Sequence, residues 1–232
     1  MKNVLITGIN KGLGKALFEL FLAKDYYVFG VLRNESAAEE LKANLPENGK
    51  LIVADLSNDA SIESIQAVVQ NGPIDLLINN AGISGEAFTL DKVESDELLD
   101  LFNIHCLGVL RTTKSVKVNL LAASDPLVIN LNSRFGSITR QSNGTHHDLD
   151  VSYSYSVAKA AQNMLTNCLR KEFKNSIKFI SLHPGKMKTD IAQTDADTEP
   201  QTVASSILEY YEHEKFKEEN GIVEIGKELI EW

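Results

Sequence analysis

The stretch of sequence that decides the fold is Thr7-Gly8-Ile9-Asn10-Lys11-Gly12-Leu13-Gly14. It follows a short apolar run, Val4 to Ile6, and leads into an amphipathic stretch from Leu13 to Lys24. Glycines permit a tight turn and the close approach of a ligand, and the first turn of a helix offers unpaired N–H groups that suit a pyrophosphate. The spacing is GxxxGxG, neither GxGxxG nor GxxxxGK[ST], so the position between a strand and a helix carries the prediction of nucleotide binding. The alternative is a plain strand-to-helix turn.

Short apolar runs recur along the chain and alternate with amphipathic stretches of helical length. The runs are Tyr27 to Leu32, Leu51 to Ala54, Ile74 to Ile78, Leu127 to Leu131 and Ile177 to Leu182. They are continuously apolar, which is typical of strands in a parallel sheet covered on both faces. Helices are expected near Ser36–Leu45, Ser57–Gln70, Asp96–Ala122, Tyr155–Phe173 and Thr202–His213. This alternation predicts an α/β fold with a doubly wound parallel sheet, in one domain over residues 1–232.

Composition excludes several classes of protein. The 232 residues are 43% hydrophobic and 24% charged, which excludes disordered, collagen-like and disulfide-scaffold chains. The net charge of −9 disfavours nucleic acid as a partner. No apolar run approaches the roughly 18 residues of a membrane span, so no membrane partner is expected and the cytoplasm is the expected location. Cys106 and Cys168 match no disulfide or metal spacing and are expected to be buried, reduced thiols.

The end of the second expected strand indicates which nucleotide is bound. A carboxylate there accepts from a ribose 2′-hydroxyl and favours NAD, whereas a cation accommodates a 2′-phosphate. Arg33 occupies this place, and Lys11 in the glycine loop adds a second cation. Both favour NADP(H), with NAD(H) and two solvated surface charges as the alternatives. Asp55 ends the third strand, where it either accepts from an adenine amino group or caps the following helix.

A candidate acid–base pair lies at Tyr155-Ser156-Val157-Ala158-Lys159. The YxxxK spacing places the two polar residues one helical turn apart on one face. A phenol has a pKa near 10, and an ammonium beside it lowers that value. Tyr155 can then donate a proton to a carbonyl oxygen as hydride reaches the carbon. The alternative is an ordinary exposed Tyr and Lys.

Five segments together resemble the short-chain dehydrogenase/reductase family over nearly the whole chain. They are Thr7-Gly8-x-x-x-Gly12-x-Gly14, Asn79-Asn80-Ala81-Gly82, Ser133, Tyr155-x-x-x-Lys159, and Pro184-Gly185 followed by Thr189. The resemblance implies a Rossmann-type domain with a seven-stranded parallel sheet and NAD(P)-dependent chemistry on alcohols and carbonyls. Asn132 to Ile138 and the tail from Gly221 to Trp232 look like segments of C-factor and sniffer-type carbonyl reductases, whose members mostly look NADPH-dependent.

The resemblance implies a role for each matching residue. Tyr155 is the general acid in reduction and the base in oxidation, Lys159 lowers its pKa and holds the nicotinamide ribose, and Ser133 polarises the substrate carbonyl. The other matches are cofactor contacts. They are Gly8, Gly12, Leu13 and Gly14 in the glycine loop, Asp55 and Leu56 near the adenosine, Asn80, Ala81 and Gly82 beside its ribose, and Pro184, Gly185, Met187 and Thr189 over the nicotinamide. Asn10 and the cations Lys11 and Arg33 are expected to contact the cofactor as well. No metal is implied.

One position departs from the family's pattern. Where an Asn that supports a relay water is usual, three residues before Gly108, this chain has His105. Asn103 is a poor substitute because helical residues two apart do not share a face. A histidine that titrates near neutral pH either holds the relay water or breaks the relay, and a third interpretation is a structural histidine. We expect retained activity with an altered pH dependence.

These observations predict an NADPH-preferring oxidoreductase that acts on a small-molecule carbonyl or alcohol. Residues 135–154 and 186–200 are expected to be loops that form the substrate site, and Phe135, Ile138 and Ile191 favour an apolar carbonyl compound. The alternative is a non-catalytic NADP(H)-binding sensor or signalling protein on the same fold. A third hypothesis is a scaffold, since the family pairs the helices near 96–122 and 155–173 across a homodimer or homotetramer.

Overall fold

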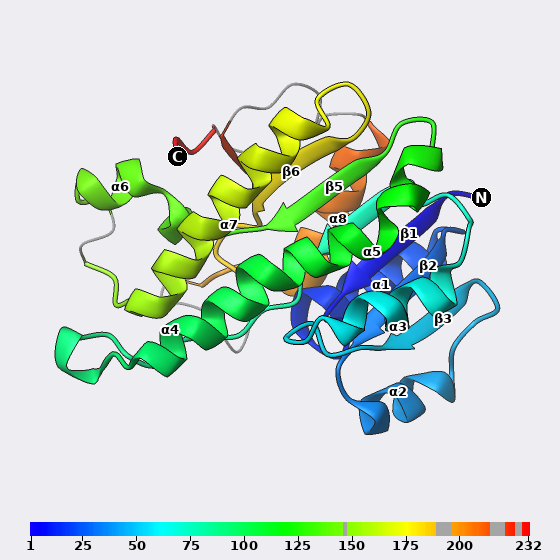
Figure 1. The fold of residues 1–232 in the computed structure, drawn as a ribbon, viewed down its shortest axis with the longest axis horizontal. Coiled ribbons are helices and arrows are strands. Elements are labelled where there is room, and N and C mark those ends of the chain that lie inside the picture. The colour runs from blue at the N-terminus through cyan, green and yellow to red at the C-terminus, as the bar shows by residue number, and fades with distance from the viewer. Residues whose placement is uncertain (146–147, 189–195, 214–220, 226–228) are drawn as a thin grey trace.

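The computed structural model describes residues 1–145, 148–188, 196–213, 221–225 and 229–232. Its centre is a seven-stranded, all-parallel sheet with the order β3-β2-β1-β4-β5-β6-β7 (Figure 1). The predicted doubly wound α/β fold is therefore confirmed. The strands are β1 (Asn3–Thr7), β2 (Tyr27–Leu32), β3 (Gly49–Val53), β4 (Leu76–Asn79), β5 (Leu127–Leu131), β6 (Lys178–His183) and β7 (Ile222–Glu224).

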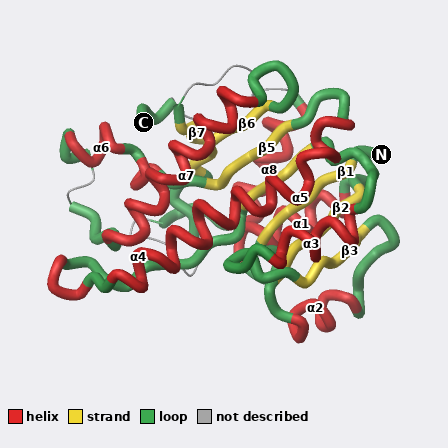
Figure 2. The backbone as a smooth tube through the Cα atoms, viewed as in Figure 1, coloured by secondary structure: helices red, strands yellow, loops and turns green. Residues whose placement is uncertain are grey.

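Helices cover both faces of this sheet (Figure 2). On one face, α1, α2 and α8 pack against the strands through residues such as Leu17, Ala38 and Ile207. On the other face, α3, α5 and α7 do so through residues such as Ile65 and Val116. The helices are α1 (Gly12–Ala23), α2 (Glu35–Lys42), α3 (Ala60–Val69), α4 (Ser95–Phe102), α5 (Gly108–Ala122), α6 (Ile138–Ser142), α7 (Tyr153–Glu172) and α8 (Pro200–Glu212), with short helical turns η1 (Leu90–Lys92), η2 (Asn103–Leu107) and η3 (Arg134–Gly136).

Burial on both faces explains why the strands are continuously apolar. Val4, Leu5 and Ile6 of β1 are all fully buried, although their side chains alternate between the two faces of the sheet. Strands β2 and β5 have the bounds that the sequence predicts, and β1, β3, β4 and β6 differ from the predicted bounds by one or two residues at each end. The chain crosses from β3 at one edge back to β4 beside β1, and this crossover reverses the direction in which strands are added to the sheet. Such a reversal opens a crevice at the carboxyl ends of the strands, where ligands bind in this class of fold.

Three expectations about local structure are wrong. The single helix expected near 96–122 is two helices, α4 and α5, separated by the π-helical turn η2. The loop expected at 135–154 contains α6, and its start is held by the chain terminus: Ser137 Oγ donates to Glu231 O at 2.6 Å, and Thr139 N to Trp232 O at 2.9 Å. Cys106 is buried as expected, but Cys168 lies on the outer face of α7 and is exposed.

Some expectations fall on residues whose structure is not described, namely Thr189 and Ile191. In the described ranges, no helix is both long enough and apolar enough to cross a membrane.

Candidate active site

The glycine loop forms a cradle because its backbone folds closely onto itself. Gly8 and Gly12 have φ of +75° and +55°, a conformation that favours glycine. A Cβ atom on Gly14 would collide with Gly8 O and with the side chain of Asn80. Asn80 Nδ2 donates to Thr7 O at 2.8 Å and to Gly8 O at 3.1 Å, so β4 holds the loop in place.

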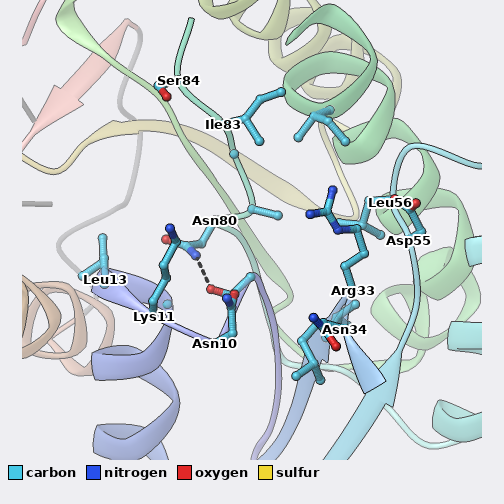
Figure 3. Close-up of a pocket in the computed structure, with 18 of the residues that line it drawn as sticks. Asn10, Lys11, Leu13, Arg33, Asn34, Asp55, Leu56, Asn80, Ile83 and Ser84 are labelled. Atoms are coloured by element: carbon cyan, nitrogen blue, oxygen red, sulfur yellow. Dashed lines mark hydrogen bonds between the residues drawn. The ribbon is translucent and has the colours of Figure 1, made fainter. Parts of the chain in front are cut away.

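This cradle is one wall of a cavity of about 600 Å³ at the carboxyl ends of β1, β2 and β4 (Figure 3). Most of the predicted cofactor contacts line it. They are Gly8, Asn10, Lys11, Gly12, Leu13, Gly14, Arg33, Asp55, Leu56, Asn80, Ala81, Gly82 and Met187. The size and the open glycine wall fit a dinucleotide, whose pyrophosphate would lie at the first turn of α1. Sequence reasoning did not identify Ile83, Ser84 and Ile104, which also line the cavity and carry no motif of their own.

The end of this cavity away from the glycine loop carries one of the two predicted cations, Arg33, and a carboxylate, Asp55. Arg33 is exposed at the end of β2, and Figure 3 shows its side chain extending beside Asp55 and Leu56. Burial acts to raise the pKa of Asp55, but hydrogen bonds from Ser57 N and Oγ, together with Arg33 and Arg111, lower it below its ordinary value. Asp55 therefore stabilises the turn after β3. It does not cap α3, whose N-cap residue is Asp59.

A second cavity of about 110 Å³ adjoins the first and contains the predicted catalytic residues. Its lining includes Ser133, Tyr155, Lys159 and His105, together with Pro184 and Gly185 from the segment after β6. Four of the described residues line both cavities and join them: Leu13, Asn80, Gly82 and Met187. A dinucleotide that extends along the first cavity would therefore end beside these side chains.

Tyr155 lies in the first turn of α7, and the turn after β5 brings Ser133 to it. Ser152 Oγ, at the N-cap of α7, accepts from Tyr155 N at 3.1 Å. Burial raises the pKa of Tyr155 to about 12, and a hydrogen bond with the Ser133 side chain acts in the opposite direction. Lys159 Nζ lies 5.7 Å from the centroid of the Tyr155 ring, and burial has the larger effect on the phenol, so the lowering of this pKa by the ammonium stays a prediction. Tyr155 is a protonated phenol at neutral pH.

Lys159 is a buried cation whose side chain points between α7 and β5. Its Nζ donates to Leu131 O at 2.7 Å and to Gln162 Oε1 at 3.0 Å. Burial lowers the pKa of Lys159 to about 7. The backbone around it is fixed, since a Cβ on Gly136 would collide with the carbonyl group of Lys159.

His105 lies in η2, and its ring meets the Tyr155 ring edge-on, with centroids 5.4 Å apart. Its Nε2 lies 2.8 Å from Ile83 O and 3.3 Å from Ile83 N. A neutral imidazole nitrogen donates or accepts but does not do both, so the shorter distance favours donation to the carbonyl. Burial, with a smaller effect of Lys159, lowers the pKa of His105 to about 3. The expectation that His105 titrates near neutral pH is therefore wrong.

Asn103 points away from the catalytic residues, in agreement with the expectation from helical spacing. Its Nδ2 donates to Ser57 O at 3.0 Å, and its Oδ1 accepts from Arg111 Nη1 at 2.7 Å. Of the apolar residues expected in the substrate site, Phe135 lines the second cavity, whereas Ile138 is exposed and does not.

The model of the short chain dehydrogenase family matches residues 2–200. The chain belongs to this family. It is 29% identical over 201 residues to the NADPH-dependent 3-dehydrocapnine reductase of Ornithobacterium rhinotracheale, covering 82% of this chain and 67% of that protein.

Solved structures of similar proteins cover the whole chain. The NADPH-bound carbonyl reductase from chicken fatty liver has a TM-score of 0.88 at 26% identity, with 100% of this chain and 99% of that chain covered. Carbonyl reductase Sniffer of D. melanogaster has a TM-score of 0.83 at 26% identity, with both chains covered completely. The fold and the enzyme class are thus those of an NAD(P)-dependent short-chain oxidoreductase.

Replacement of Gly14 tests the cradle. We expect Gly14→Ala to weaken binding of the nicotinamide dinucleotide roughly tenfold or more, because the methyl group displaces Gly8 O or Asn80. Fluorescence titration with NADPH measures the effect. Gly72→Ala is the matched control, since nothing lies within 4 Å of its Cβ position. Equal binding by the two variants would contradict this account of the cradle.

Replacement of His105 tests its neutral state. The folded protein resists protonation of His105, so between pH 6.5 and 3 the unfolded chain binds more protons and stability falls as the pH falls. Between pH 7 and pH 5, the free energy of unfolding of His105→Asn should therefore fall by about 2 kcal/mol less than that of the wild type. The measurement is urea unfolding of both proteins at pH 7 and pH 5. If the free energy of unfolding fell equally in the two proteins between pH 7 and pH 5, His105 would accept a proton as readily in the folded state as in the unfolded chain.

Proposed function

We propose that this protein is an NADPH-dependent carbonyl reductase that also catalyses the reverse oxidation of an alcohol. The observation that carries the proposal is the meeting of Ser133, Tyr155 and Lys159 at the end of a glycine-cradled cavity large enough for a dinucleotide. The names of the relatives support the cofactor and the substrate class, because one is an NADPH-dependent reductase and two are carbonyl reductases.

Each residue of the site has a separate role in the proposed reaction. The dinucleotide supplies a hydride when it is bound. Ser133 Oγ hydrogen-bonds the substrate carbonyl oxygen, and the Tyr155 hydroxyl donates a proton to that oxygen as the alcohol forms. Lys159 Nζ lies 5.7 Å from the centroid of the Tyr155 ring, and its positive charge stabilises the phenolate left behind. His105 and Gly82 close the wall behind Tyr155.

The protonation state of Tyr155 favours the direction of reduction. A phenol whose pKa is raised to about 12 holds its proton at neutral pH and is ready to act as an acid. The oxidation direction requires the phenolate, so its rate should rise with pH.

The two cations that line the first cavity support NADPH over NADH. Arg33 and Lys11 both line the first cavity, and neither β2 nor the residue after it offers a carboxylate to a ribose 2′-hydroxyl. A planar guanidinium suits a phosphate group, which it can bind with two parallel hydrogen bonds.

Replacement of Tyr155 tests the proposal against the sensor hypothesis. We expect Tyr155→Phe to abolish consumption of NADPH with aldehydes, ketones and diketones, because the proton donor is lost, while NADPH still binds. Absorbance follows the turnover and fluorescence titration follows the binding. Turnover that survives in the variant would remove Tyr155 from the mechanism. A wild-type protein that binds NADPH but reduces none of the panel would favour the sensor.

Replacement of Arg33 tests the choice of cofactor. We expect Arg33→Asp to raise the KM for NADPH roughly tenfold or more while the KM for NADH stays equal or falls. Steady-state kinetics with both cofactors provide the comparison. Lys15→Asp is a control, since Lys15 is a surface residue of α1 that pairs with Glu19 and does not line the cavity. An unchanged preference in Arg33→Asp would overturn the assignment of Arg33.

A further inference from the structure

The side chain of Gln162 is buried next to the catalytic end of the cavity, where it contacts Lys159. The two residues are three apart in α7 and therefore share a face of the helix. Gln162 is 2% exposed and Lys159 is 5% exposed. The distance of 3.0 Å between Gln162 Oε1 and Lys159 Nζ is that of a good hydrogen bond to a charged donor.

The backbone on both sides of this contact is held independently of it. Asn132 Nδ2 donates to Lys159 O at 3.2 Å, and Thr166 Oγ1 donates to Gln162 O at 2.8 Å. The close approach of Gly136 to the Lys159 carbonyl adds a steric constraint. The Gln162 side chain is therefore not needed to fix the helix, and its carbonyl is left to act on the ammonium.

Gln162 Oε1 is a neutral acceptor for the Lys159 ammonium in a cavity whose described lining residues include no carboxylate. The titratable and charged residues that line this cavity with Lys159 are Tyr155 on its own helix, His105 on η2, Arg134 after β5, and His183 and Lys186 at and after the end of β6. None of the described residues that line this cavity is an Asp or a Glu. A buried ammonium loses hydration that only hydrogen-bond acceptors can replace, and the structure provides Leu131 O and Gln162 Oε1.

We infer that Gln162 is a positioning residue for the reaction, which keeps Lys159 charged and directs it through the bond from Nζ to Oε1. The inference rests on the proposed function, in which Lys159 must be a cation. An ammonium has three N–H donors, of which Leu131 O and Gln162 Oε1 take two and leave one for the cavity. Because burial already brings the pKa of Lys159 to about 7, a small loss of stabilisation changes its charge at working pH.

Two substitutions of similar size shift the charge of Lys159 in opposite directions. In Gln162→Leu the ammonium loses an acceptor, so the alkaline limb of the profile of kcat against pH should move down by about one pH unit. In Gln162→Glu a carboxylate faces the ammonium, so the limb should move up by at least about one unit. Damage to the fold would not move the limb in opposite directions in the two variants.

Thr112→Val is the matched control. It replaces a buried polar side chain of α5, which donates to Gly108 O and does not contact Lys159 or Gln162. Its alkaline limb should coincide with that of the wild type. A limb that stays in place in both Gln162 variants, or moves in the same direction in both, would overturn the inference.

A measurement without turnover separates this inference from the proposed function. Lysine labelled with 13C at Cε reports the titration of Lys159 by NMR in the cofactor-free protein, with the resonance assigned from Lys159→Arg. The midpoint should move down in Gln162→Leu and up in Gln162→Glu. If these shifts occur in a protein that reduces no carbonyl, Gln162 holds the ammonium and the proposed function fails. If turnover depends on Tyr155 but the midpoints do not move, the proposed function stands and the inference about Gln162 fails.

Discussion

The contact between Asn80 and the end of β1 is the constraint on which the rest of the site depends. Thr7 Oγ1 accepts from Asn80 N and Ala81 N, both at 3.0 Å, while the Asn80 amide donates back to Thr7 O and Gly8 O. Four hydrogen bonds thus join two strands at the point where the sheet reverses its growth. The glycine loop can turn sharply above this junction because its carbonyls are already satisfied.

Beneath the catalytic residues lies a layer of buried amides and hydroxyls, where an apolar core would be expected. Asn79 Nδ2 donates to Asn130 Oδ1 at 2.8 Å, and Asn130 Nδ2 donates to Thr166 Oγ1 at 2.9 Å. Asn163 accepts from Ser181 Oγ at 2.6 Å and donates to Gly136 O at 3.0 Å. Asn79 Oδ1 has no hydrogen-bond partner among the described residues, but the bonds of the other groups fix their side chains in one arrangement, because a displacement would leave them buried and unpaired. The layer connects β4, β5 and β6 to α7 and so sets the position of Lys159.

Much of this architecture follows from local patterns in the sequence. Continuous apolar runs predicted the strands because both faces of the sheet are covered, and the GxxxGxG loop and YxxxK pair predicted residues that line the two joined cavities. Gln162 was not predicted, because a single amide in a helix gives no periodic signal and its partner lies buried beside it. The raised pKa of Tyr155 and the lowered pKa of His105 also escaped prediction, since both follow from burial by residues distant in sequence. The π-helical turn is similarly a result of packing, and the apolar pattern on either side of it reads as one helix.

The turn η2 divides the rod formed by α4 and α5 into two helices that differ in phase. Gly108 N donates to Asn103 O, a hydrogen bond across five residues that accommodates one residue more than an α-helical turn. One residue corresponds to about 100° of rotation about the helix axis. Buried residues of α5, such as Val116 and Leu120, face the sheet, whereas Asn103 within the turn faces Arg111 and His105 faces Tyr155. Deletion of one residue within 103–107 would restore a regular helix, and it would do so by rotating His105 out of the wall behind Tyr155. The orientation of His105 therefore depends on the number of residues in this turn more than on which residues they are.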